Sequence, residues 1–135
     1  MNDIELLATY RARVAALREL EEQISRSTPT GLKALRGANE PSAAALQLSD
    51  GLDAMAKRQR EELERLWPQV LALTSRINDV RLYMIVHHYY VLAQTIEQIA
   101  ERLYVSPRTV ARLKKGYLDG LRKEGLDLTG PAVVQ

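Results

Sequence analysis

Residues 95–113 read TIEQIAERLYVSPRTVARL, and the start signals of two short helices in this stretch decide the expected fold. Thr95 stands three residues before Gln98, which is the pattern of a capping box, in which each side chain bonds a backbone N–H at the start of a helix. Ser106 is a preferred N-cap residue, and Pro107 follows it at the first helical position, where a missing N–H has no cost. The stretch therefore predicts two helices that meet across a short turn.

The apolar residues of this stretch are spaced so that both helices bury one shared core. They are Ile96, Ile99, Leu103, Val105, Val110 and Leu113, with the small Ala100 where the helices cross. Such a pair is a helix-turn-helix, whose second helix enters the major groove of DNA. Tyr104 occupies a turn position where Gly is usual. A left-handed conformation is common there, and it costs a non-Gly residue about 1 kcal/mol or more.

The residues expected to face DNA lie on and beside the second helix. Arg108 and Arg112 are four residues apart, hence on one helix face, and either side chain suits a bidentate contact to guanine. Ser106, Thr109 and Lys115 are better placed for contacts to phosphates. The alternative is that these are ordinary surface residues of a helical domain that binds protein. The candidate DNA-binding residues are Ser106, Pro107, Arg108, Thr109, Ala111, Arg112, Lys114 and Lys115.

Positive charge is concentrated in the same region. The whole chain carries a net charge of only +2. Residues 1–77 hold 11 Lys/Arg and 11 Asp/Glu, and so sum to zero. Residues 106–123 hold six Lys/Arg against Asp119 alone, which gives a local charge of +5. A basic cluster on a recognition helix is what attraction to phosphates requires.

Two long amphipathic helices are expected ahead of this motif. The first spans residues 3 to about 26, and its apolar stripe comprises Leu6, Leu7, Tyr10, Val14, Leu17, Leu20 and Ile24. The second begins at about Ser49, and spacings of four and three run along Leu52, Ala56, Gln59, Leu63, Leu66, Val70, Leu73 and Ile77. That seam is typical of a coiled coil. Pro68 interrupts it and is expected to kink the helix or split it near Leu66.

The segment between these helices, 27–41, holds two Pro and two Gly and predicts a loop. Two antiparallel helices joined by this loop would cover each other's stripes as a helical hairpin. Pairing with a second chain would cover the same surface. The sequence leaves both arrangements open, and a homodimer through the N-terminal helices is one of them.

The expected architecture is therefore all-α, with an N-terminal antiparallel long-helix hairpin followed by a C-terminal three-helix domain. The hairpin covers 1–77, the helix-turn-helix domain covers 78–124, and 125–135 form a tail. The first helix of that domain is expected to begin at Val80, capped by Asn78 or Asp79, and to run through VRLYMIVHHYYVL. The recognition helix is expected to end at about Arg122, before Gly125.

The sequence does not show the residue patterns typical of a disulfide framework, a metal site, a catalytic site or a membrane span. The chain has no Cys, which excludes disulfides and Cys-based metal sites and agrees with the cytoplasm. His87 and His88 are adjacent, so on a helix they point about 100° apart and do not share a metal, and a partly exposed face is expected for them. No nucleophile motif, phosphate-binding Gly loop or apolar run long enough for a membrane span is present. We expect neither an enzyme, nor a cofactor, nor membrane contact.

The C-terminal half resembles region 4 of bacterial sigma factors. The similarity rests on residues 78–113, NDVRLYMIVHHYYVLAQTIEQIAERLYVSPRTVARL, and it extends over about 78–122. Small phage regulators with a sigma-region-4-like end, the ArpU/RinA-type late-transcription proteins, share this pattern more closely. Two positions depart from it: Tyr89 stands where those relatives often carry Arg, and Ala93 stands where they often carry Gly.

This resemblance implies a phage-encoded transcription regulator that binds specific double-stranded DNA sequences, and it suggests RNA polymerase as a second partner. Two other functions fit the same residues. A small-terminase-like packaging or replication factor also joins a helix-turn-helix to a helical oligomerisation segment, usually with the DNA-binding part first. A protein–protein adaptor would use the same helices without nucleic acid.

Overall fold

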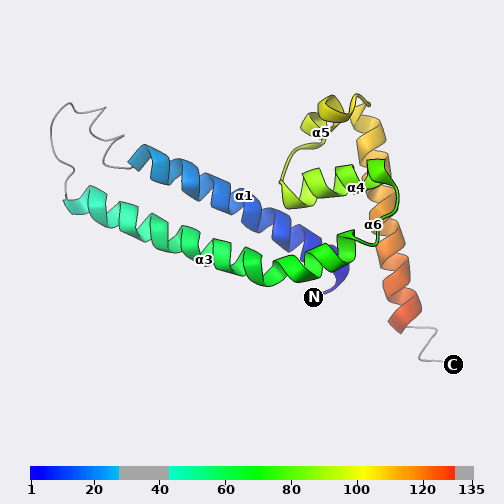
Figure 1. Cartoon of the computed structure of the whole chain (residues 1–135), viewed down its shortest axis with the longest axis horizontal. Helices are drawn as coiled ribbons and strands as arrows, with labels where there is room; N and C mark the ends of the chain where they lie inside the picture. Colours follow the sequence, from blue (N-terminus) through cyan, green and yellow to red (C-terminus); the bar gives the residue numbers. More distant parts are fainter. Residues whose placement is uncertain (28–42, 130–135) are drawn as a thin grey trace. The chain divides into compact units, whose positions relative to one another are not determined.

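The computed structural model of the chain describes residues 1–27 and 43–129, and these are helical apart from short connections, with no strand among them. The expected all-α class is thus confirmed. The helices, in order, are α1 (Asp3–Ser27), α3 (Ala43–Thr74), α4 (Val80–Val86), the π-helix η1 (His87–Val91), α5 (Ile96–Leu103) and α6 (Pro107–Thr129) (Figure 1). Apart from Ser27, the predicted loop 27–41 lies outside the described residues. Within the described part of the chain, no helix combines the length and the apolar character needed to cross a bilayer.

The chain divides into two compact units, one of which comprises Arg13–Arg65. Within this unit, α1 and α3 lie side by side and run in opposite directions (Figure 1). Leu52 and Ala56 of the predicted seam are buried. The polar seam residue, Gln59, accepts a hydrogen bond from the guanidinium of Arg13 at 3.1 Å. Gln59 therefore has a polar partner on the neighbouring helix rather than an apolar one.

The second unit comprises Met1–Ala12 together with Leu66–Gln135. In one layer of this unit, the start of α1 packs against the end of α3, and the ring centres of Tyr10 and Trp67 lie 6.0 Å apart. The unit that holds residues 78–124 thus also contains the start of α1 and the end of α3. The domain boundary expected at residue 77 stays a prediction. The buried apolar residues of this layer are Leu6, Leu7, Tyr10, Leu66, Val70 and Leu73.

Helix α3 is continuous through Pro68, so of the two outcomes expected there, a kink or a split near Leu66, the split does not occur. Proline removes one N–H and leaves the carbonyl of residue i−4 without its helical partner. That residue is Glu64, and both Glu64 and Pro68 are exposed, so water can bond the freed carbonyl. The three alanines at 43–45 are strong helix formers and make a short helical start at Ser42 plausible. The structure joins that start to the long helix expected from about Ser49, so that α3 begins at Ala43.

The predicted boundaries in the C-terminal half are partly confirmed. Helix α4 begins at Val80 as expected, but the side chain of Asp79, its N-cap residue, makes no capping hydrogen bond. Helix α6 runs to Thr129 rather than ending at about Arg122. Gly125 lies inside it, because a single Gly costs a helix only about 1 kcal/mol and does not by itself end one.

Candidate nucleic-acid interface

The start of α5 is fixed by the capping box that the sequence predicts. The Thr95 hydroxyl accepts the backbone N–H of Gln98 at 3.1 Å, and the Gln98 side-chain oxygen accepts the backbone N–H of Thr95 at 2.9 Å. Two N–H groups that a helix start leaves without partners are thereby satisfied. The position at which α5 begins is thus set locally by these two side chains.

The turn after α5 closes in a left-handed residue. Tyr104 has φ 57° and ψ 41°, the conformation for which Gly is usual at this position. Its N–H bonds the Glu101 carbonyl at 3.4 Å, and the next N–H, of Val105, reaches back to the Ala100 carbonyl at 3.1 Å. These two bonds form a Schellman motif, which reverses the chain at a helix end. The Tyr104 side chain is 95% exposed, so no burial offsets the strain of about 1 kcal/mol.

The start of α6 is capped by Ser106, as predicted. Its hydroxyl accepts the backbone N–H of Thr109 at 3.1 Å and lies 2.9 Å from the Thr109 hydroxyl. Since one of the two hydroxyls donates to the other, one hydroxyl hydrogen of the pair remains for an outside acceptor. Ser106 therefore caps the helix, and the pair of hydroxyls offers at most one donor to a phosphate.

Helices α5 and α6 share a small core with α4. Ile85, Ile99, Ala100 and Val110 are buried, with exposures between 0% and 2%. The burial predicted for Ile99, Ala100 and Val110 is thus confirmed, and it fixes which face of α6 points outward. The half-buried residues packed against this core are Tyr89, Ile96, Leu103, Val105 and Leu113.

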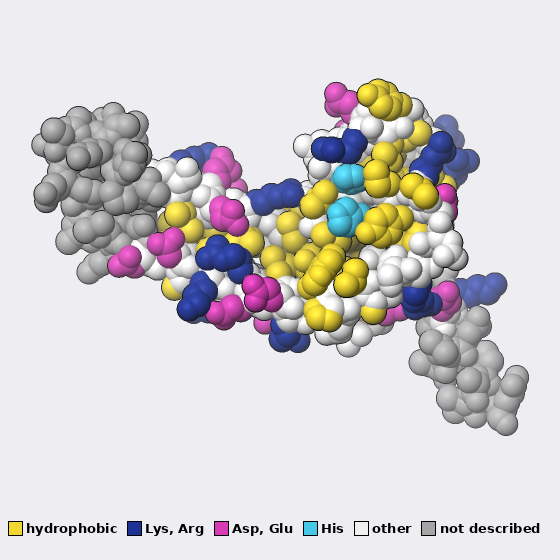
Figure 2. Space-filling model, in the orientation of Figure 1, with side chains coloured by type: hydrophobic (Ala, Val, Ile, Leu, Met, Phe, Trp, Pro, Cys, Tyr) yellow, Lys and Arg dark blue, Asp and Glu magenta, His cyan; other side chains and the backbone are white. Residues whose placement is uncertain are grey.

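Three basic side chains project from the opposite side of α6. Arg108, Arg112 and Lys115 are exposed, and no ion pair or hydrogen bond engages them within the described part of the chain. Their spacings of four and three place them on one helix face. Figure 2 shows Lys and Arg side chains gathered beside the first turns of α6. Of the other predicted contact residues, Ser106 and Pro107 are exposed, whereas Thr109, Ala111 and Lys114 are half-buried.

Lys114 has a second role that the sequence did not indicate. Its ammonium lies 4.5 Å from the centre of the Tyr89 ring, and the guanidinium of Arg11 lies 4.1 Å from the same ring. A cation over an aromatic face gains about 0.5–1 kcal/mol at a partly exposed site. Lys114 is therefore held toward η1, and it is less available to DNA than Lys115.

Arg11 also fixes the connection between η1 and α5. Its guanidinium donates to the backbone carbonyls of Tyr89 at 3.1 Å and Gln94 at 3.3 Å. These carbonyls belong to a helix end and a connecting segment, where carbonyls lack helical partners. An arginine of α1 thus takes part in the C-terminal unit through two long-range hydrogen bonds.

The helix expected over VRLYMIVHHYYVL changes form along its length. It is α-helical to Val86 and then continues as the π-helix η1, in which the Leu92 N–H bonds the His87 carbonyl at 3.1 Å. After Leu92, Ala93 has φ 54°, and the Gln94 N–H reaches back to the His88 carbonyl at 3.0 Å. Ala93 thus adopts the left-handed conformation that the Gly of the sigma-like pattern would adopt readily. π-Helical turns are rare, and the hydrophobic periodicity of the sequence did not predict this one.

The two histidines lie in different surroundings. No group of three metal-ligating side chains occurs among the described residues. His87 is half-buried and stacks on Tyr83 with ring centres 5.7 Å apart, but His88 is buried, which corrects the expectation of a partly exposed face. Burial and then the nearby positive charge of Arg102 lower the pKa of His88, so its neutral form is favoured.

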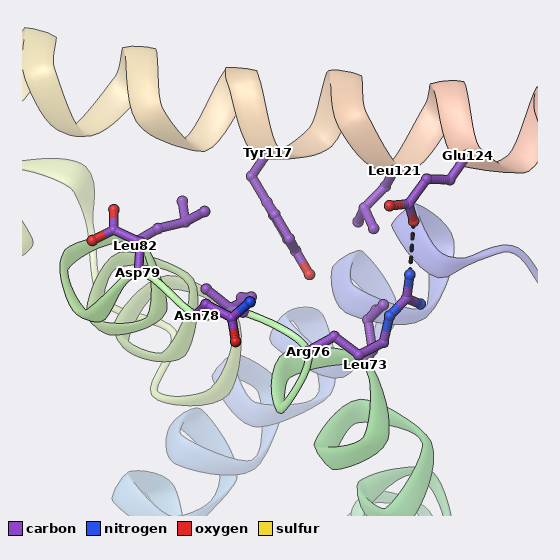
Figure 3. A pocket seen from close by; sticks show the side chains of 9 residues that line it. Leu73, Arg76, Asn78, Asp79, Leu82, Tyr117, Leu121 and Glu124 are labelled. Atoms are coloured by element: carbon purple, nitrogen blue, oxygen red, sulfur yellow. Dashed lines mark hydrogen bonds and ion pairs between the residues drawn. The ribbon is translucent and has the colours of Figure 1, made fainter.

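The second half of α6 is anchored against the end of α3 and the start of α4. Arg76 and Glu124 form an ion pair at 2.9 Å beside a cavity of about 260 Å³ (Figure 3). Tyr117 points into this cavity, and no partner for its hydroxyl occurs among the described residues. Burial raises the pKa of Tyr117 to about 12. Its position four residues after Leu113 and four before the buried Leu121 is the signal by which the sequence could have placed it on the inner face.

Comparison with known proteins leaves the family of this chain open. No protein-family model matches it, and neither characterised proteins nor solved structures give a match. The similarity to sigma region 4 therefore stays a prediction from the sequence, and function is inferred from the residues of α5, the turn and α6.

Proposed function

We propose that the chain is a sequence-specific double-stranded DNA-binding protein that regulates transcription, with α6 as the helix that enters the major groove. One observation carries this proposal: Arg108, Arg112 and Lys115 form an exposed basic face on a helix whose other face is buried against α5 and α4. A helix with its side chains is about 10–12 Å wide, and the major groove is about 12 Å wide.

The chemistry of this face suits a duplex. Arg108 and Arg112 carry planar guanidinium groups that can each donate two hydrogen bonds to the O6 and N7 acceptors of guanine. Lys115, one turn further along the helix, carries a point charge suited to a phosphate. The local charge of +5 over residues 106–123 adds attraction that does not depend on sequence.

The remaining parts of the proposal concern assembly and context. The N-terminal helices would mediate a homodimer, and the exposed Met55 of α3 offers apolar surface for a second chain. A phage or prophage origin and contact with RNA polymerase follow from the resemblance to sigma region 4. A cytoplasmic location and the absence of catalysis belong to the same proposal.

Binding of the full chain to duplex DNA tests the proposal. A labelled 30-base-pair duplex selected from a random pool would be titrated with the wild type, Arg108→Ala and Arg112→Ala, and anisotropy would be measured. We expect each change to weaken binding about 10- to 100-fold, since a bidentate contact to a base is worth about 1–3 kcal/mol. Arg60→Ala is the matched control, because Arg60 is an exposed arginine of α3 in the other unit.

Three results would count against the proposal. Wild-type affinity that stayed weak at low salt would favour a protein–protein adaptor. Equal losses for Arg60→Ala and the two α6 variants would mean that α6 does not carry the contact. Strong DNA binding by a ring of many copies, seen in the measured mass, would favour a packaging factor over a regulator.

A further inference from the structure

Tyr104 is the most exposed large hydrophobic residue of the described part of the chain, and it stands at a strained backbone position. Its side chain is 95% exposed, and its backbone has φ 57°. No ring contact or side-chain hydrogen bond engages it within the described residues. Nothing in the fold offsets the strain that Gly would avoid, and strain of this kind is found mainly at functional sites.

A groove of about 430 Å³ lies beside this tyrosine. It is lined by Gln94, Gln98, Glu101, Arg102 and Tyr104. Four of these five side chains are hydrogen-bond donors of the kinds that contact DNA phosphates. The oxygen of the Gln98 amide is taken by the Thr95 N–H, so the NH2 end of that amide remains as the donor. Glu101 is the one acidic side chain and is balanced by the exposed Arg102.

The groove also lies close to the start of α6 along the chain. Tyr104 is two residues before Ser106, which caps α6, and Arg108 is two residues after that cap. A helix that places its first turns in the major groove brings the preceding turn near the phosphates that border the groove. The aromatic side chain is long enough to extend from the turn toward that border.

Resting on the proposed function, we infer that the groove beside α5 binds a backbone phosphate of the same duplex, with the Tyr104 hydroxyl and the Arg102 guanidinium as the contacting groups. This contact positions α6 without reading sequence. The left-handed turn residue is thus a tyrosine rather than a glycine because its side chain serves binding.

Three variants of the full chain separate strain from contact. Tyr104→Gly removes both the strain and the side chain, Tyr104→Phe removes only the hydroxyl, and Ala93→Gly relieves the same kind of strain without removing an exposed side chain. We expect both glycine variants to raise the melting temperature by about 3 °C. We expect Tyr104→Phe and Tyr104→Gly, but not Ala93→Gly, to weaken DNA binding about 10-fold or more.

The probe is a labelled mixed-sequence 30-base-pair duplex, measured beside the selected duplex. A phosphate contact predicts the same fold loss on both, because it carries no sequence information. Arg102→Gln should lower the slope of log affinity against log salt by about 0.9, whereas Tyr104→Phe should leave it unchanged, since a neutral phenol displaces no counterion.

The outcomes separate this inference from the proposed function. If the wild type bound neither duplex, the proposed function would fail, and this inference with it. If the wild type bound with a steep salt slope and Tyr104→Phe bound equally well, only the phosphate contact would be overturned. If Tyr104→Gly, Tyr104→Phe and Ala93→Gly all bound DNA with wild-type affinity, the phosphate contact would likewise be overturned. That result would point to a protein partner for the Tyr104 side chain.

Discussion

Replacement of Arg11 by alanine should destabilise the C-terminal unit more than any other loss of a single arginine from α1. The side chain donates to the Tyr89 and Gln94 carbonyls and lies over the Tyr89 ring. Because Arg11 is half-buried, each bond is taken at about 1 kcal/mol and the ring contact at about 0.5 kcal/mol. The expected loss is about 2–2.5 kcal/mol, which lowers the melting temperature of a chain of this length by about 7–9 °C.

The only tryptophan, Trp67, provides a local probe for this test. It packs against Tyr10, the neighbour of Arg11, within the same compact unit. Urea unfolding followed by Trp67 fluorescence would measure the free energy of unfolding of the unit that contains Arg11. Arg11→Lys should lose about half as much free energy of unfolding as Arg11→Ala. An ammonium keeps a cation near Tyr89 but lacks the planar fork that reaches two carbonyls.

Arg18→Ala is the matched control for Arg11→Ala. Arg18 is exposed on the same helix, and its loss should change the free energy of unfolding by less than about 0.5 kcal/mol. If Arg11→Ala were no more destabilised than Arg18→Ala, the two long-range hydrogen bonds would contribute nothing. The view that α1 stabilises the connection before α5 would then be wrong.

Three further changes have defined outcomes. Gly116→Ala and Gly120→Ala should each raise the free energy of unfolding by about 0.5–1 kcal/mol in urea titrations, because both positions are exposed within α6 and an added methyl meets no atom within 4 Å. Thr95→Ala should lower it by about 1 kcal/mol through loss of the cap on α5, and Gln98→Ala should remove only the reciprocal bond and cost less. Burial raises the pKa of Tyr117 to about 12, above the value of about 10 in the unfolded chain, so this group favours folding below pH 10 and its contribution is lost between pH 10 and 12. Tyr117→Phe should therefore lose less stability than the wild type between pH 9 and pH 11, and an equal loss would mean that Tyr117 does not titrate in the folded state as its burial requires.

The parts of the fold that the sequence predicts are those set by neighbours along the chain. The capping box at Thr95 and the cap at Ser106 involve residues three positions apart, so their patterns could be recognised directly. The buried seam of α3 and the core positions of α5 and α6 follow from helical periodicity. The left-handed turn was likewise indicated by the place of Tyr104 in the pattern.

The parts that escaped prediction depend on contacts between distant residues. Arg11 bonds carbonyls 78 and 83 residues away, and no local pattern in α1 marks it out from its other arginines. The half-burial of Lys114 depends on the ring of Tyr89 in the same way. The sequence does not decide between a kink and a split at Pro68, because the exposure of Glu64, one helical turn before it, is a property of the folded chain.

The salt dependence of DNA binding by the full chain tests the central claim most directly. If α6 lies in the groove with its basic face toward the duplex, log affinity for a mixed-sequence duplex should fall steeply with log salt, by about 0.9 for each phosphate neutralised. Lys115→Gln should lower that slope by about one such step, whereas the exposed control Arg60→Gln should not change it. A wild-type slope near zero, or a slope unaffected by Lys115→Gln, would contradict the assignment of α6 as the DNA-binding helix.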